Sequence, residues 1–167
     1  MSFDSQKKII NKTNPIDYIE DYVINDDIEI YRLSRNEITI SSEGIWKNYK
    51  ISFKWDEIKK IIEVNSYFDM SKKNKIRKSI YSLLSNVNKK ANVGFFNFCP
   101  KLNTIFFSYK ISVKGQNYIT VEQVQDFIDC VTSECDRFFP VFFVFFYKKQ
   151  DPAHALDIAV LDTYGEA

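Results

Sequence analysis

The side chains that could carry out catalysis or bind a metal are few and poorly placed in this sequence. His154 is the only histidine, so a zinc site lacks a second imidazole and no cysteine has an obvious neighbouring base. Cys130 and Cys135 lie about 140° apart around a predicted helix, which prevents a shared metal or disulfide. We therefore expect no catalytic residues, no metal and no cofactor, and we interpret the chain as a non-enzymatic protein.

A run of basic residues is a stronger candidate for binding. It lies at the start of a predicted helix, where the helix macrodipole favours acidic residues, so an anion such as nucleic acid or an acidic protein would explain it. The alternative is an ordinary solvated face, which we favour because 23 basic and 22 acidic residues leave a net charge of only +1. The anion-binding candidates are Lys72, Lys73, Lys75, Arg77 and Lys78.

An aromatic run over residues 138–147 is the second candidate surface. It is about half as long as the roughly 20 residues that a bilayer requires, and Pro140 is expected to kink the helix or begin a new segment, so we do not interpret it as a membrane span. Phe139, Phe143 and Tyr147 lie beside the apolar stripe of the helix, and we interpret them as candidates for binding a protein partner. The residues expected in the core are Phe138, Phe142, Phe145 and Phe146.

The spacing of apolar residues predicts the elements that must position these candidates. Asn14 and Pro15 are typical of a helix start, and Thr120 with Gln123 resembles a capping box. Period-two alternation, clearest over residues 49–55, predicts strands. The expected elements are a helix over 15–25, strands over 28–33, 38–46, 49–55 and 62–68, a helix over 76–91, a hairpin of strands over 93–99 and 104–113, a helix from 121, and a helix over 153–161.

These elements predict an α+β fold. An antiparallel sheet of about six strands would carry its helices on one face, in the order α-β-β-β-β-α-β-β-α-α. Gly44 is interpreted as a bulge in the second strand. No repeat or linker divides the chain, so we expect residues 1–13 to form a mobile arm and residues 14–167 a single domain. Three cysteines in no regular framework, and no apolar segment after the first lysines, indicate a cytoplasmic protein.

Several short segments form a pattern, in order and in register. They are Gly44, Ile45, Trp46, Lys47, Asn48 and Tyr49 with Trp55; Phe68 and Asp69; Glu134, Cys135, Asp136, Arg137, Phe138, Phe139 and Pro140; and Leu161, Asp162, Thr163, Tyr164, Gly165, Glu166 and Ala167. Together they resemble the YbjN family of bacterial proteins. The resemblance implies a fold similar to that of type III secretion chaperones and a role in regulating bacterial sensory transduction, with no established active site. The basic residues of 72–78 depart from the acidic approach to the middle helix that is typical of the family.

Composition and resemblance together predict a regulatory, chaperone-like or adaptor protein that holds a segment of a protein partner. We expect a homodimer, because a domain with 15 Phe and 10 Tyr leaves apolar surface that a monomer would expose. The alternative is a nucleic-acid- or anion-binding regulator that uses residues 72–78. Raised salt separates the two, since binding to phosphates weakens steeply with salt.

Overall fold

The computed structural model of the protein describes residues 14–25, 28–69, 78–116, 118–148 and 151–163. Within these ranges it has the predicted α+β architecture, with six strands and four helices in the predicted order. The expected N-terminal arm, residues 1–13, lies outside the described residues. The elements are α1 (Pro15–Asn25), β1 (Ile30–Ser34), β2 (Glu37–Glu43), β3 (Asn48–Asp56), β4 (Ile61–Phe68), α2 (Ile80–Asn88), β5 (Phe95–Cys99), β6 (Thr104–Ser112), α3 (Val121–Tyr147) and α4 (Pro152–Thr163).

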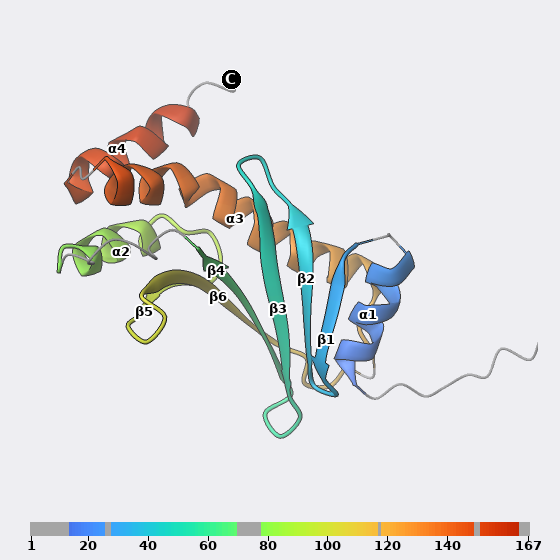
Figure 1. The fold of residues 1–167 in the computed structure, drawn as a ribbon. Coiled ribbons are helices and arrows are strands. Elements are labelled where there is room, and N and C mark those ends of the chain that lie inside the picture. Colours follow the sequence, from blue (N-terminus) through green and yellow to red (C-terminus); the bar gives the residue numbers. More distant parts are fainter. Residues whose placement is uncertain (1–13, 26–27, 70–77, 117, 149–150, 164–167) are drawn as a thin grey trace, which may run out of the picture.

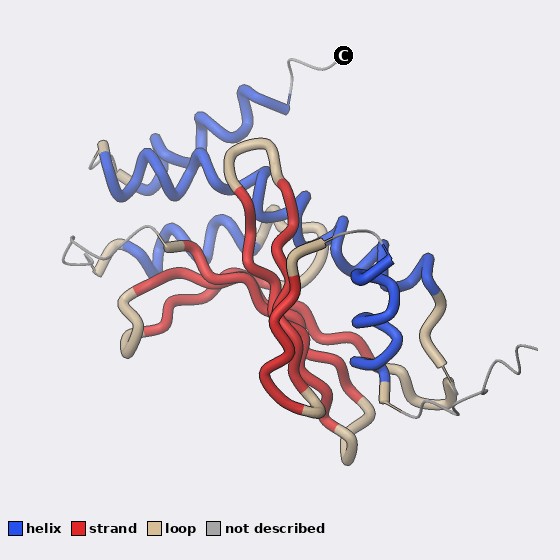
Figure 2. The backbone as a smooth tube through the Cα atoms, turned by 45° about the vertical axis from the view of Figure 1, so that its right-hand side comes forward, coloured by secondary structure: helices blue, strands red, loops and turns tan. Residues whose placement is uncertain are grey.

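The strands form one antiparallel sheet in the order β1-β2-β3-β4-β6-β5. Figures 1 and 2 show that the sheet is strongly twisted, that α3 crosses behind it, and that α1 lies beside β1. In β3, Tyr49, Ile51, Phe53 and Trp55 are buried, while the residues between them are exposed or half-buried. This period-two pattern places one face of the sheet on the core and leaves the other face open.

The first helix is fixed to the sheet by its N-cap. The buried Asn14 side chain accepts a hydrogen bond from the backbone N–H of Ile16 (2.9 Å), which satisfies one of the free donors at the helix start. Its amide group donates to the backbone oxygen of Arg35 and to the side chain of Asn36, both at 2.9 Å. The predicted cap therefore also ties α1 to the turn between β1 and β2.

The long helix α3 begins as predicted and supplies much of the core. The Thr120 hydroxyl accepts from the N–H of Gln123, and the Gln123 side chain accepts from the N–H of Thr120, which completes the capping box. Further along, the Phe142 ring lies 5.3 Å from the ring of Phe68 and 5.2 Å from that of Phe96. The predicted core residues are buried, namely Phe138, Phe142, Phe145 and Phe146.

Three local features differ from the prediction. Strand β2 ends at Glu43, so Gly44 is not a bulge and instead begins the turn to β3. Helix α2 ends at Asn88, because the Asn88 side chain accepts from the N–H of Phe96 and donates to its oxygen, which turns the chain towards β5. Pro140 does not begin a new segment, since α3 continues through it with buried residues on both sides.

Candidate functional site

Four aromatic side chains form a continuous row on the outer side of α3. Phe139, Phe143 and Tyr147 are spaced by four residues, so they lie on one face of the helix. The ring centroids are 6.2 Å apart between Phe139 and Phe143 and 4.9 Å apart between Phe143 and Tyr147. Trp46, from the turn between β2 and β3, stacks on Phe139 at 6.1 Å with an interplanar angle of 11°. We call these four residues the aromatic ladder.

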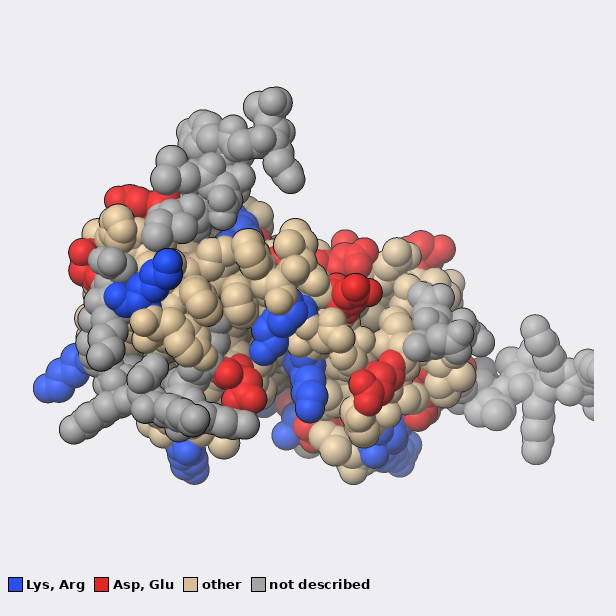
Figure 3. All heavy atoms as spheres, turned by 45° about the horizontal axis from the view of Figure 1, so that its top comes forward, with Lys and Arg blue, Asp and Glu red and all other residues tan. Residues whose placement is uncertain are grey.

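The aromatic ladder is exposed although it is apolar. Trp46 is 52% exposed, Phe143 is 41% exposed and Tyr147 is 52% exposed. Ile45, which precedes Trp46 in the turn, is 83% exposed. Figure 3 turns the side with α3 and the β2–β3 turn towards the reader and shows a broad uncharged surface with charged side chains around it. Contiguous exposed apolar surface of this kind indicates an interaction site.

The turn that carries Trp46 is fastened to α3 by the carboxylate of Asp136, a residue that is only 9% exposed. This group accepts hydrogen bonds from the backbone N–H of Ile45 (2.9 Å) and from the hydroxyl of Tyr49 (2.8 Å). The N–H of Trp46 donates to the same carboxylate at 3.5 Å. Burial, and then the Asp136 contact, raise the pKa of Tyr49 well above its usual value, so its hydroxyl stays protonated and remains a donor.

Pro140 allows a second hydrogen bond between α3 and the turn that carries Trp46. In an α-helix the N–H of residue 140 would bond to the carbonyl of Asp136, but proline has no N–H. The freed carbonyl of Asp136 accepts a hydrogen bond from the indole N–H of Trp46 at 3.1 Å. The proline that was expected to interrupt the helix therefore provides the acceptor that orients the first ring of the aromatic ladder.

Gly44 allows the turn to approach α3 closely. A Cβ at this position would lie 2.3 Å from Cε2 of Tyr49 and 2.8 Å from Oδ1 of Asp136. Neither group can retreat freely, because the two are hydrogen-bonded to each other and buried. The position therefore requires glycine for close approach, and two of the segments that resemble the YbjN family meet here in space.

The structure brings the three predicted partner-binding candidates together, and their role in binding stays a prediction. It adds Trp46, which lies 93 positions before Phe139 in the chain and which the sequence did not single out for this surface. The acidic Asp136 lies between the buried residues Cys135 and Phe138 of α3, and its need for hydrogen-bond partners was the signal that could have revealed the attachment. Of the predicted anion-binding residues, Lys78 is exposed, and the others, Lys72, Lys73, Lys75 and Arg77, lie outside the described residues.

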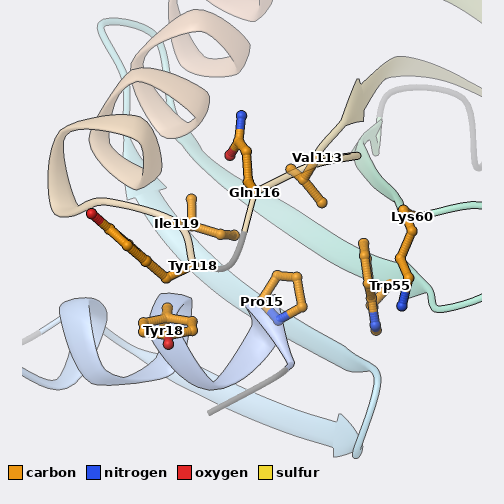
Figure 4. A pocket seen from close by; sticks show the side chains of 8 residues that line it. All are labelled: Pro15, Tyr18, Trp55, Lys60, Val113, Gln116, Tyr118 and Ile119. Atoms are coloured by element: carbon orange, nitrogen blue, oxygen red, sulfur yellow. The ribbon is translucent and has the colours of Figure 1, made fainter. Parts of the chain in front are cut away.

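A small pocket lies where α1 meets the sheet. Figure 4 shows Trp55 and Lys60 on one side of it, Tyr18 and Tyr118 on the other, and Pro15 between them. The Lys60 ammonium group lies 5.6 Å from the centre of the Trp55 ring. The pocket volume is about 80 Å³, well below the roughly 300–1,000 Å³ typical of ligand sites. We interpret it as a small gap in the packing of α1 against the sheet, not as a ligand site.

Two further features bear on the kind of site that the chain can hold. In the ranges that the structure describes, no group of three His, Cys, Asp or Glu side chains is placed to hold a metal ion. None of the helices in these ranges combines the length and apolarity needed to cross a bilayer.

Comparison with known proteins identifies the family. The family model named YbjN, described as "Putative bacterial sensory transduction regulator", matches residues 15–144. The chain belongs to the YbjN family. The matched range includes the ladder residues Trp46, Phe139 and Phe143, together with Asp136 and Pro140, so the site lies almost wholly within the YbjN match.

A solved structure is also similar to this chain. It is the "Crystal structure of YbjN, a putative transcription regulator from E. coli", with 14% sequence identity and a TM-score of 0.48. The similarity covers 75% of this chain and 88% of that chain. No curated protein matches the chain.

Proposed function

We propose that this YbjN-family protein is a non-enzymatic regulator that binds a segment of another protein on the aromatic ladder. The observation that carries the proposal is that Trp46 is half exposed and yet held by its stacking on Phe139 and by the carbonyl of Asp136. An aromatic surface that is already ordered loses little conformational entropy on binding. Trp and Tyr are also the residues that most often dominate the energy of protein interfaces.

The surroundings of the ladder define the chemistry of the partner. A row of rings along one helix suits the apolar face of an amphipathic helix laid beside α3. The half-buried Lys47 follows Trp46 and the exposed Lys148 follows Tyr147, so both ends of the ladder carry a basic residue. We propose a partner segment with apolar residues in its middle and acidic residues towards its ends.

A photo-crosslinking residue at position 143 tests this proposal. Benzoylphenylalanine in place of Phe143 keeps an aromatic ring, and we expect it to form a discrete protein adduct in the source cell. The matched control carries the same residue in place of Ile58, which is 94% exposed in the β3–β4 turn. The adduct should be lost when Trp46→Ala is added to the variant at position 143.

Two outcomes would contradict the ladder as a protein-binding surface. One is an adduct of equal yield from position 58, because it would show that exposure alone is sufficient. The other is an adduct that contains RNA or DNA and weakens steeply with salt, which would support the nucleic-acid-binding alternative instead.

We also propose that the protein forms a homodimer in which two ladders cover each other until a partner segment displaces one of them. An isologous interface uses the same patch on both subunits, and a row of apolar rings is suited to self-association. Static light scattering at micromolar concentration should give a dimer mass for the wild type and a monomer mass for Phe143→Ser. A monomer mass for the wild type contradicts the dimer without affecting the crosslinking result.

A further inference from the structure

Strands β3 and β4 separate at one end of the sheet. Their pairing runs from Asp56 with Ile61 up to Ile51 with Ser66. Beyond that point the register pairs β3 only with β2 and β4 only with β6. Figure 1 shows the two strands diverging towards the β2–β3 turn. We call this opening in the sheet the strand fork.

A groove of about 530 Å³ lies in the strand fork. This volume falls within the roughly 300–1,000 Å³ that is typical of sites for small molecules. One wall is formed by Lys47, Asn48 and Lys50, at the end of the turn and the start of β3. The opposite wall includes Tyr67, near the end of β4, and Asp69, just after it.

The two lysines of the groove carry charges that the described part of the chain does not neutralise. Neither Lys47 nor Lys50 forms an ion pair with a described carboxylate, whereas Lys59 and Lys110 each do. Across the groove, burial raises the pKa of Tyr67, so its hydroxyl stays protonated and can donate a hydrogen bond. The groove therefore presents donors to a ligand that accepts hydrogen bonds and carries negative charge.

We propose that the strand fork binds a small anion through Lys47 and Lys50, by a carboxylate or phosphate group of that anion. Charge-assisted hydrogen bonds of this kind are among the strongest that a protein makes. The volume of the groove suits a small molecule with one anionic end rather than a strand of nucleic acid. Lys47 directly follows Trp46, so the groove and the aromatic ladder share the β2–β3 turn. Only an effect of the anion on partner binding through this turn rests on the proposed function.

Titration of the ¹⁵N-labelled full chain tests the proposal, with sodium phosphate in one series and sodium citrate in another, at constant ionic strength. We expect saturable shifts of the backbone amide signals of Asn48, Lys50 and Tyr67 with at least one of the two anions. Lys50→Gln should weaken binding about tenfold or more, the loss expected for one charge-assisted hydrogen bond. The matched control is Lys54→Gln, which changes an exposed lysine on the same face of β3 outside the groove.

The arms of the titration separate the two chemistries. Saturation by phosphate alone indicates a phosphate-bearing ligand, saturation by citrate alone indicates a carboxylate, and either result supports the site. Shifts that stay linear to tens of millimolar for both anions overturn it, as does an equal loss of binding in Lys54→Gln. Crosslinking from position 143 needs no added anion, so the strand fork and the ladder can fail independently.

Discussion

Two rows of aromatic rings lie one residue apart along the second half of α3. In the inner row, Phe138, Phe142 and Phe145 are at most 1% exposed, whereas in the outer row Phe143 and Tyr147 are 41% and 52% exposed. Both rows consist of aromatic residues, so composition does not decide which of them forms the core. The angle around the helix decides, because 3.6 residues per turn direct each row to a different neighbour.

The two rows also differ in their ring contacts. Phe142 packs against Phe68 and Phe96, which come from separate strands of the sheet. In the outer row, Phe139 contacts Phe143 and Phe143 contacts Tyr147, and Phe139 also stacks on Trp46 from the β2–β3 turn. We infer that the inner row contributes mainly to stability and the outer row mainly to binding.

The largest expected effect follows from truncating the inner row. Phe142→Ala should lower the free energy of unfolding by about 3–5 kcal/mol, because it leaves a cavity among packed rings. Phe143→Ala, one position away, should cost less than about 1 kcal/mol, since its ring is partly in water. Chemical denaturation without lipid measures both values. Equal losses in the two variants would contradict the assignment of the inner row to stability and the outer row to binding. An unchanged midpoint for Phe142→Ala with lost vesicle binding would favour a membrane role for the aromatic run of residues 138–147.

A smaller loss is expected where Asp136 attaches the β2–β3 turn to α3. Asp136→Ala removes the acceptor of the buried Tyr49 hydroxyl and of the Ile45 N–H, so it should cost about 2 kcal/mol. Asp129→Ala changes an exposed carboxylate on the same helix and should cost less than about 0.5 kcal/mol. If both variants unfold at the same denaturant concentration, Asp136 does not hold the turn as we describe.

Tyr49, which is hydrogen-bonded to Asp136, should make the free energy of unfolding depend on pH. Its pKa is raised in the folded state by burial and by the Asp136 contact, so the stability from this group is fully present below the unfolded-state pKa of about 10 and is lost as pH rises above it. The difference in free energy of unfolding between the wild type and Tyr49→Phe should be constant from pH 7 to 9 and should fall above pH 10. Burial also raises the pKa of the Cys135 thiol, so the stability of both proteins begins to fall near the ordinary thiol pKa of about 8.5. Tyr49→Phe should show a shallower fall. Equal slopes for the two proteins would exclude Tyr49 as a cause, since the raised pKa values of Tyr67 and Tyr109 affect both.

Most of the fold could be predicted because it depends on local patterns. The buried face of β3, the cap at Asn14 and the capping box at Thr120 follow from residue types at short spacing. The same periodicity separated Phe139, Phe143 and Tyr147 from the core stripe. The end of α2 could not be predicted from its apolar stripe, because it depends on a contact outside the helix, between Asn88 and the backbone of Phe96.

The rest of the site could not be predicted, because it depends on contacts between segments about 90 residues apart. Trp46 and Asp136 meet only once the β2–β3 turn packs on α3. Pro140 acts through an absent N–H, and local rules treat that absence only as a helix defect. The strand fork depends on where the pairing of β3 and β4 stops, and the alternation within each strand contains no information on that point.

The smallest expected change in stability comes from Pro140→Ala, and it should affect the outer row alone. Alanine restores an N–H at residue 140, which can bond to the Asp136 carbonyl within the helix and compete with the indole N–H of Trp46. In a Trp55→Phe background the emission of Trp46 should shift to longer wavelength and its anisotropy should fall, because the ring loses one of its attachments. The free energy of unfolding should not decrease by more than about 1 kcal/mol, since removing an interior proline relieves a helix defect. Pro152→Ala is the matched control, because Pro152 begins α4 and a first-turn proline frees no helix carbonyl. Unchanged Trp46 emission in Pro140→Ala would show that stacking on Phe139 is sufficient to hold the ring.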